Sequence, residues 1–450
     1  MTQKIWISYH KDEQIEQYGL KEDATHILFP THKKAEKRNI NHLNPVYSEM
    51  VTMWYVWKNN LKSKYVGFEH YRRHFEVSRY PRKGECQIYR VVDFLFESVY
   101  NQYGRCHSRS DMDLMLQAID NRYGKDNPYT KNIRESHVLV SNCCFLMHWA
   151  DFVKMCEFLF PLLDDFAALC GLPTDKLEKW QKKAVRDFGQ NGRVEYQTRC
   201  LSFLAERLIS AWILTNLAPY LHNRNVAIVH YNTPELTMAT IRSLMKNSPG
   251  FRVTVFDNSD EKPFVAKMPN VDIIDNTKGQ IIDFDKIIEK YADRDKNDVK
   301  LSNYGSAKHS MSVDYLTRVL PEGFILLDSD VLVKQFLGKL WDESFACAGA
   351  VEKKHDIPLL SPFVCYLNTR MLYDKGVTYF NGDKMWALTE KIPNRYYDTG
   401  AWLYEGVSTN NLPMQLFDIW QFVEHLGHGS WRRNGDRARE WLEKHKKLWE

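Results

Sequence analysis

The sequence lacks the features of secreted, membrane-spanning and nucleic-acid-binding proteins. Its nine cysteines show no Cys-x-x-Cys spacing, and such usage is typical of a reducing compartment, so we expect a cytoplasmic protein. The N-terminus reaches charged residues too soon for a signal peptide. The most hydrophobic region, 145–163, contains Asp151, Lys154 and Glu157, so no membrane span is expected. A net charge of +4, from 61 basic and 57 acidic residues, provides no basic stripe for nucleic acid.

The length and the distribution of apolar runs indicate two domains. A chain of 450 residues is too long for one ordinary core. Apolar runs at 4–10 and 226–232 end in polar residues, as buried parallel strands do where they reach a site. Helical spacing at 153–166 and 198–217 predicts long helices between the two strands. The segment 218–225, with a proline and several polar residues, indicates a linker.

Two carboxylates follow a predicted strand in the second half. A helix over 234–246 and strands over 252–256 and 324–327 alternate as in a parallel sheet, and the last strand runs into Asp328-Ser329-Asp330. Side chains i and i+2 point the same way on an extended chain, so both carboxylates can face one cation. Hard oxygen ligands suit Mg²⁺ or Mn²⁺. A capped turn with solvated acids is the alternative interpretation.

Polar residues elsewhere in this half could join the same site. Asp257 and Asn258 end the preceding strand, where a carboxylate could accept a hydrogen bond from a pyrimidine N–H. Asn303 lies at the start of a helix that leads to the Asp-Ser-Asp strand. His425 and His428 lie in a glycine-rich segment, where a neutral imidazole could complete a metal shell. A structural role for these histidines is the alternative.

Residues 226–431 resemble a GT-A glycosyltransferase domain of the large family that includes bacterial polysaccharide transferases. The matching pieces are VAIVHYNTPE, VFDNSD, NYGSAKH, FILLDSDVLV and HLGHGSW. The resemblance implies a nucleotide-sugar donor, with a UDP-sugar favoured. The donor-binding residues expected in this half are Tyr231, Asn232, Asp257, Asn258 and Asn303. The resemblance further implies a Mn²⁺ or Mg²⁺ ion held by Asp328 and Asp330 with a late histidine, of which His428 is the first candidate and His425 the second.

The same resemblance implies a carboxylate that deprotonates the acceptor hydroxyl. Asp398, in the segment Tyr-Tyr-Asp-Thr-Gly, is our candidate for this base, and Glu405 is the second candidate. The Glu-Asp pair that is usual in the inverting members is absent. The base and the stereochemical outcome therefore stay open.

In the first half, the segment 65–75 ends a short apolar run with an unusual cluster of charged and imidazole side chains. Glu69, His70, Arg72 and Arg73 lie within five residues. Arginine pairs present planar donors to phosphate or carboxylate groups, so a donor diphosphate is one ligand that would fit. A buried ion-pair network at the sheet edge is the alternative.

Residues 1–217 resemble the capsular-polysaccharide glycosyltransferase domain that is typified by a His-Tyr-Arg-Arg motif. The matching pieces include NPVYSE, WYVWKN, GFEHYRRHF, DMDLMLQAI, SNCCFLMHWADF and FLAERLISAWI. The resemblance implies a GT-A-like transferase, with galactofuranose from a UDP donor as one activity in the family. The donor-binding residues it implies are His10, Lys11, Glu49, Arg72 and Arg73, and the catalytic candidates are Glu69 and His70. We read Asp111-Met112-Asp113 as a helix cap with first-turn acids, so the metal need of this half stays open.

The predicted fold class is therefore α/β, with two GT-A-like, Rossmann-related domains of mostly parallel sheet in tandem and a helical segment between them. The expected bounds are 1–222 and 223–431. The remaining residues, 432–450, predict a basic amphipathic helix. Its apolar stripe could lie on an anionic membrane near a lipid-linked acceptor, at the inner face of the cytoplasmic membrane. Docking onto the catalytic domain or a partner chain is the alternative.

The favoured function is a bifunctional glycosyltransferase that adds two sugars in succession to a capsule or O-antigen glycan. One active domain with a glycan-binding partner domain is a milder version. The segment ILLDSDV also fits the nucleophile strand of haloacid-dehalogenase-like phosphotransferases, but no later pair of adjacent acids follows it. A nucleotidyltransferase would need a glycine-rich basic loop after the first strand, and neither half supplies one. A lectin-like scaffold without catalysis is the remaining alternative.

Overall fold

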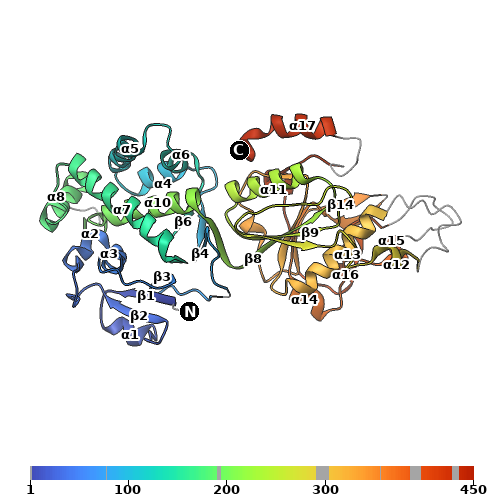
Figure 1. Ribbon diagram of the computed structural model, residues 1–450, viewed down its shortest axis with the longest axis horizontal. Coiled ribbons are helices and arrows are strands. Elements are labelled where there is room, and N and C mark those ends of the chain that lie inside the picture. Colours follow the sequence, from blue (N-terminus) through green and yellow to red (C-terminus); the bar gives the residue numbers. More distant parts are fainter. Residues whose placement is uncertain are drawn as a thin grey trace. The chain divides into compact units, whose positions relative to one another are not determined.

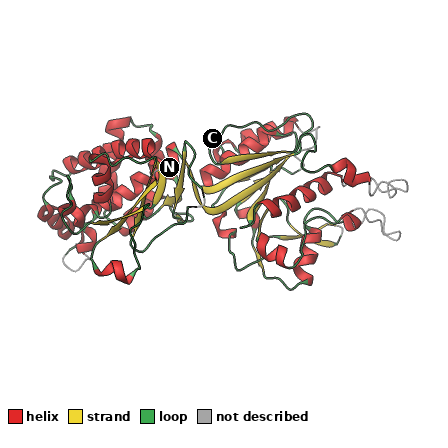
Figure 2. Ribbon diagram, turned by 60° about the horizontal axis from the view of Figure 1, so that its bottom comes forward, coloured by secondary structure: helices red, strands yellow, loops and turns green. Residues whose placement is uncertain are grey.

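The computed structural model describes residues 3–77, 79–189, 194–289, 304–354, 356–385, 397–427 and 435–450. These residues form two compact units, Met1–His222 and Asn223–Glu450 (Figure 1). Both units are α/β, and in each of them helices pack against a sheet (Figure 2). Parallel strand pairs predominate among the described strands of the main sheet, to which both units contribute through β8, as expected for the fold class.

The sheet of the first unit places the ends of two parallel strands side by side. β1 (Gln3–Tyr9) lies between β2 (His26–Pro30) and β3 (Tyr65–His70), and both neighbours run parallel to it. The sheet continues through β7 (Phe145–His148), antiparallel to β3, and β4 (Glu85–Ile88). A separate ribbon pairs β5 (Val91–Asp93) with β6 (Val138–Val140). Since β1 and β3 end at the same edge, residues that follow them meet there.

Most helices of the first unit share one large hydrophobic core with its sheet. The helices of this unit are α1 (Glu13–Gln17), α2 (Asn44–Tyr47), α3 (Met50–Lys58), α4 (Val99–Cys106), α5 (Arg109–Tyr123), α6 (Pro128–Glu135), α7 (Trp149–Leu169), α8 (Leu177–Phe188), α9 (Val194–Gln197) and α10 (Cys200–Asn216). Phe152 and Leu159 of α7 and Leu204 of α10 are fully buried in this core. The predicted helices over 153–166 and 198–217 correspond to α7 and α10, and α7 is longer than predicted at both ends.

The segment predicted as a linker is a strand, so that prediction is wrong. β8 (Ala218–His230) pairs in parallel with β4 from Ala218 to Tyr220, and its residues 226–229 pair in parallel with β11. Pro219 lies at the start of the strand, where a missing backbone N–H is tolerated. Tyr220 is fully buried, and this burial overrides the loop-like composition of the segment.

The sheet of the second unit is centred on β8 and β11 (Phe324–Asp328). On one side β9 (Gly250–Asp257) pairs with β8, and β10 (Val271–Asp275) follows. On the other side β16 (Val364–Leu367) runs antiparallel to β11, followed by β13 (Cys347–Gly349) and β17 (Met414–Leu416). Two small ribbons are β12 (Val331–Val333) with β18 (Val423–His425), and β14 (Val351–Lys354) with β15 (Ile357–Leu360).

The helices of this unit are α11 (Pro234–Asn247), α12 (Phe284–Glu289), α13 (Tyr304–Val319), α14 (Thr369–Asp374), α15 (Gly382–Met385) and α16 (Ala401–Thr409). The elements predicted over 234–246, 252–256 and 324–327 correspond to α11, β9 and β11.

The C-terminal helix α17 (Gly435–Lys444) docks on the second unit. Asn247 of α11 donates from Nδ2 to the Leu448 carbonyl at 2.9 Å. The predicted apolar stripe is partly buried; its members are Ala438, Trp441, Leu442, His445, Leu448 and Trp449. The basic residues outside the stripe are exposed; they are Arg437, Arg439, Lys444, Lys446 and Lys447. Within the described residues, every helix is too short or too polar to span a lipid bilayer.

A buried ion pair ties α5 to α8 in the first unit. α5 begins at Arg109, so Asp111 lies in its first turn and is not the cap that the sequence suggested. Lys183 donates to the two Asp111 oxygens at 2.6 and 2.8 Å and to Asp187 at 2.7 Å. Both Asp111 and Lys183 are almost fully buried. Removal of one partner would leave an uncompensated buried charge.

We therefore expect Lys183→Ala to lower the free energy of unfolding by about 3–5 kcal/mol. Urea denaturation of the full chain measures this change. Arg122→Ala is the matched control, because Arg122 pairs with Asp165 at 2.6 Å on the surface and its loss should cost at most about 1 kcal/mol. Equal losses in the two variants would contradict a structural role for the buried pair.

Candidate functional site

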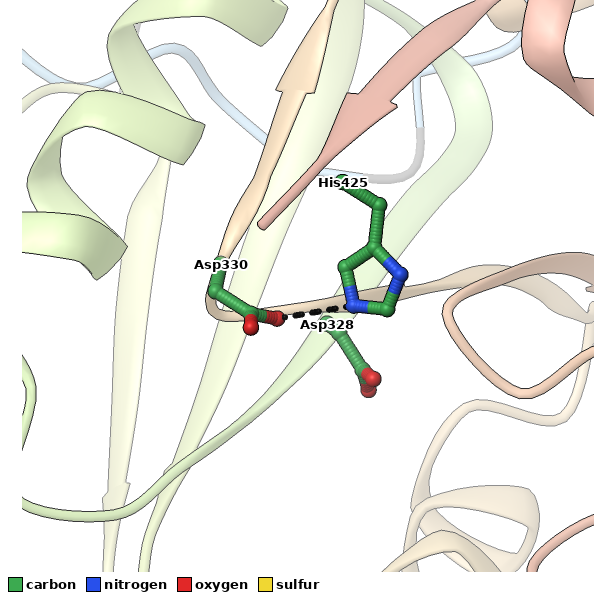
Figure 3. Close-up of side chains that lie close together, drawn as sticks. All are labelled: Asp328, Asp330 and His425. Carbon is green, nitrogen blue, oxygen red and sulfur yellow. Dashed lines mark ion pairs between the residues drawn. The ribbon is translucent and has the colours of Figure 1, made fainter. Parts of the chain in front are cut away.

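Three potential metal ligands meet at the carboxyl edge of the second sheet. Asp328 ends β11, Asp330 follows in the turn, and His425 ends β18. One ligand atom from each of the three lies within 4.8 Å of the others. Figure 3 shows the two carboxylates and the imidazole directed toward a common space, with an ion pair of 3.2 Å between His425 Nε2 and Asp330 Oδ1. Two hard carboxylates and an imidazole form a donor set that suits Mn²⁺ or Mg²⁺.

The β12–β18 ribbon brings His425 to the two aspartates. Val331 pairs with His425 in antiparallel register, and Leu426 donates its N–H to the Asp330 carbonyl at 3.1 Å. The His425 ring stacks on Phe363 with the centroids 4.3 Å apart. Burial lowers the pKa of His425, but the hydrogen bond to Asp330 and the charges of Asp330 and Asp328 outweigh burial, so its pKa lies above the ordinary value.

Two predicted donor-binding residues, in the loop after β8, form hydrogen bonds to the loop after β9. Tyr231 Oη donates to Asp260 at 2.9 Å, and Asn232 Nδ2 donates to the same carboxylate at 2.6 Å. Asn232 has a φ of 56°, a left-handed conformation that asparagine tolerates well. Thr233 Oγ1 lies 3.3 Å from Ser329 Oγ, so this loop also contacts the Asp-Ser-Asp turn. The loops after β8, β9 and β11 are therefore joined at one edge of the sheet.

Asp257 and Asn258 are largely engaged within the protein. Asp257 is buried and accepts from the N–H groups of Ser259 at 2.9 Å and Phe264 at 2.7 Å. Asn258 donates to Ser312 at 2.8 Å and accepts from Asn276 at 3.0 Å. Their visible role is to shape the loop after β9, and direct contact with a nucleotide base stays a prediction.

The candidate base Asp398 lies in a polar cluster before α16. Ser306 donates to it at 2.7 Å, and Lys354 forms an ion pair with it. Burial raises the pKa of Asp398, but the hydrogen bonds from Lys354 and Ser306 and the charge of Lys354 outweigh burial and hold the pKa below its ordinary value. Burial, and then the charges of groups that include Asp328 and Asp398, raises the pKa of the Tyr379 hydroxyl.

The second base candidate, Glu405, is held by Tyr397, whose hydroxyl donates to it, and has Lys384 Nζ at 3.9 Å. Neither carboxylate is a free acceptor, and their assignment as base stays a prediction. Asn303 and His428, which the sequence suggested for the donor and the metal, lie outside the described residues.

His309 is a residue of this site that the sequence analysis missed. It lies on α13, and its Nε2 is 3.3 Å from Asp328 Oδ1. His309 and Ser306 are three residues apart and lie on the same side of the helix. The segment NYGSAKH was recognised as a matching piece, but helical spacing alone does not show which side chain faces Asp328.

In the first unit, His10 and His70 meet where β1 and β3 end. Their Nε2 atoms are 3.4 Å apart, and His10 Nδ1 lies 2.6 Å from Thr31 Oγ1. Burial, the charges of Arg199 and Arg72, and the neighbouring His32 lower the pKa of His10 to about 4. Burial, the neighbouring His10 and the charges of Arg73, Arg72 and Arg199 lower the pKa of His70 to about 3. Both rings are therefore neutral at pH 7.

The other predicted residues of this unit differ in their surroundings. Glu69 is buried and accepts from His74 Nδ1 at 2.7 Å and from the Phe75 N–H at 3.1 Å. Burial and the charge of Glu206 raise the pKa of Glu49, although the charges of Arg73 and Arg199 act the other way. Lys11 is exposed at the end of β1. Their roles toward a donor or in catalysis stay predictions.

Comparisons with known proteins add the following. A family model described as a domain of unknown function, DUF4422, matches residues 4–217. No curated protein sequence matches the chain. The apo structure of the bifunctional glycosyltransferase WbbM is 14% identical with a TM-score of 0.36, over 93% of this chain and 87% of that chain.

Two further structures match about half of the chain. The galactosyltransferase LgtC in complex with donor and acceptor sugar analogues is 12% identical with a TM-score of 0.29, over 43% of this chain and 73% of that chain. The apo-form glycosyltransferase GlyE of Streptococcus pneumoniae TIGR4 is 12% identical with a TM-score of 0.27, over 50% of each chain. At these identities and TM-scores, the activity has to be argued from the site itself.

We expect Asp330→Asn to weaken Mn²⁺ binding by at least about 100-fold, since loss even of groups that only support a metal ligand costs 10–100-fold. Titration with Mn²⁺, followed by electron paramagnetic resonance of the free ion, measures this affinity. Glu424→Gln is the matched control: Glu424 precedes His425 on β18, faces away from it, and pairs with Lys334 at 2.8 Å. An unchanged affinity in Asp330→Asn would rule out this cation site.

The Mn²⁺ affinity should also depend on pH through His425. A proton on the imidazole competes with the cation, and the pKa of His425 is raised. The affinity should therefore be full above this raised pKa and fall as the pH drops through it, starting at a higher pH than for an ordinary histidine. The same titration repeated between about pH 6 and pH 8 tests this. His425→Gln should bind more weakly and lose this step, whereas an affinity independent of pH in the unmodified chain would refute it.

Proposed function

We propose that the second unit is a glycosyltransferase that takes a sugar from a nucleotide-diphosphate donor, with a UDP-sugar favoured. The observation that carries the proposal is the convergence of Asp328, Asp330 and His425 at the carboxyl edge of a largely parallel sheet. Ligands of α/β sheets bind at this edge. The resemblance of residues 226–431 to GT-A domains favours a nucleotide-diphosphate sugar as the donor.

Different residues of this unit would have different roles in the transfer. The divalent cation would be held by Asp328, Asp330 and His425. When bound, it would neutralise the negative charge of the diphosphate leaving group. Tyr231 and Asn232 fix the loop beside the cation ligands through Asp260. Asp398, which Ser306 and Lys354 hold, is our candidate for the residue that accepts a hydrogen bond from the acceptor hydroxyl.

The first unit is proposed as a second glycosyltransferase in the same chain, with galactofuranose as one donor sugar. The proposed site comprises His10 and His70 where β1 and β3 end, Arg72 and Arg73 in the turn after β3, Lys11 just after β1 and Glu49 just before α3. Two transferases in one chain keep the effective concentration of the glycan high for the second step. We place the protein in the synthesis of a capsule or O-antigen glycan in the cytoplasm. The exposed basic face of α17 would favour the inner face of the membrane, where lipid-linked acceptors lie.

A screen of nucleotide sugars for hydrolysis and transfer, with and without Mn²⁺, tests the proposal. Asp330→Asn should lower one transfer by at least about 100-fold, because it removes a cation ligand. Arg72→Ala should lower only the transfer carried out by the first unit, because Arg72 lies in that unit.

Glu424→Gln and Arg134→Ala, which change charge outside the two sites, serve as controls. If Asp330→Asn left both transfers intact, the assignment of the second unit would fail. If Arg72→Ala left both intact, the assignment of the first unit would fail.

A further inference from the structure

The helix α13 brings a largely buried imidazole to one of the candidate cation ligands. His309 Nε2 lies 3.3 Å from Asp328 Oδ1. Both ring nitrogens of His309 are buried, yet neither has a hydrogen-bond partner among the described residues. Buried polar atoms in folded proteins almost always have a partner. Hydrogen bonds at functional sites are often long or poorly aligned in the free protein and tighten when the ligands bind.

The helix that carries His309 is fixed against the strand that carries Asp328. Val313 and Leu316 of α13 and Leu326 of β11 are fully buried in one hydrophobic cluster. Protein interiors are densely packed, so α13 and β11 cannot shift independently of each other. The position of the imidazole beside the carboxylate is therefore set by the packing of the fold.

The same side of α13 also holds the candidate base. Ser306, three residues before His309, donates from Oγ to Asp398 Oδ1 at 2.7 Å. Side chains three residues apart on a helix have Cβ atoms about 5–6 Å from each other. One turn of α13 therefore contacts a carboxylate of the candidate cation site and the candidate base.

His309 lies outside the set of potential cation ligands. Within the described ranges, that set consists of Asp328, Asp330 and His425. An imidazole that contacts a ligating carboxylate without joining the ligand set acts on the cation through that carboxylate. Loss of such a supporting partner typically weakens metal binding about 10–100-fold.

We propose that His309 is a positioning residue of the second unit, which holds the Asp328 carboxylate in the orientation that binds the divalent cation. The imidazole N–H donates to Asp328 and leaves the remaining acceptor sites of the carboxylate to the cation. The Asp328 side chain is 26% exposed, and His309 limits the rotation that this exposure would allow. Ordering a ligand before binding lowers the entropy cost of binding. This inference rests on the proposed function only for the use of the cation in sugar transfer.

Titration of the full chain with Mn²⁺, followed by electron paramagnetic resonance of the free ion, tests the inference. His309→Phe keeps a ring but removes both nitrogens, and it should weaken Mn²⁺ binding by about 10–100-fold. His309→Gln restores an N–H donor and should recover part of the affinity. Ser310→Ala is the matched control, because Ser310 is buried on the same helix but does not share the side of His309. Its affinity should not change.

Two further measurements separate positioning from the other roles of a histidine. In pulsed electron paramagnetic resonance of the Mn²⁺-loaded chain, a coordinated nitrogen gives a hyperfine coupling. His425→Gln should lose this coupling, whereas His309→Phe, loaded at a higher Mn²⁺ concentration, should keep it. Thermal denaturation without Mn²⁺ should show little change in His309→Phe, because the free protein loses no hydrogen bond of this ring.

Three outcomes would overturn the inference. The first is an unchanged Mn²⁺ affinity in His309→Phe, and the second is a His309→Gln variant that binds no better than His309→Phe. The third is loss of the nitrogen coupling in His309→Phe, which would make His309 a ligand itself. None of these results depends on sugar transfer. If the variants behave as expected while no nucleotide sugar is hydrolysed or transferred, the positioning role stands and the transferase assignment fails.

Discussion

The site of the second unit depends on a short antiparallel ribbon between β12 and β18. β11 alone delivers two carboxylates to the edge of the sheet, and two acids with no partner there would repel each other. The pairing of Val331 with His425 places an imidazole beside them across about a hundred residues of sequence. The ion pair between His425 and Asp330 offsets the cost of burying Asp330 in the absence of a cation. The ribbon therefore keeps the ligands in place before any ion binds.

The parts of this site that the sequence predicts are those set by local pattern. Four apolar residues followed by Asp-x-Asp placed Asp328 and Asp330 at a strand end, and the structure has them there. Spacing alone could not show that His425 lies beside the two aspartates, because its position depends on the β12–β18 register. His428 lies outside the described residues. His309 was missed for a similar reason: its contact with Asp328 depends on how α13 packs, which no local pattern encodes.

Tertiary pairing also explains the wrong prediction in the fold. The segment 218–225 has the proline and polar residues of a loop, and local propensity therefore indicated a linker. The edge of β4 provides a pairing partner for residues 218–220, and Tyr220 gains full burial there. Strand propensity depends on context more than helix propensity does. This is why the helices at α7, α10 and α11 were easier to predict than β8.

The acids of the second unit differ in how their charge is stabilised, and this difference indicates their roles. Asp257 has both oxygens bound to backbone N–H groups of one loop, so it fixes structure. Asp398 is stabilised by Lys354 and Ser306, and a carboxylate with a lowered pKa orients a hydroxyl better than it removes its proton. Within the described part of the chain, the Asp328 carboxylate forms its one ion pair with His309, and it shares the candidate cation site with His425.

The first unit presents the opposite electrostatic arrangement. Burial is the first cause that lowers the pKa values of both His10 and His70, and the charges of neighbouring arginines act in the same direction. Both imidazoles therefore stay neutral at pH 7. In the second unit, burial also acts to lower the pKa of His425, but the hydrogen bond to Asp330 and the charges of the two aspartates outweigh burial and raise this pKa instead. The same residue type is therefore held neutral among basic groups in one unit and stabilised in its protonated form by acids in the other.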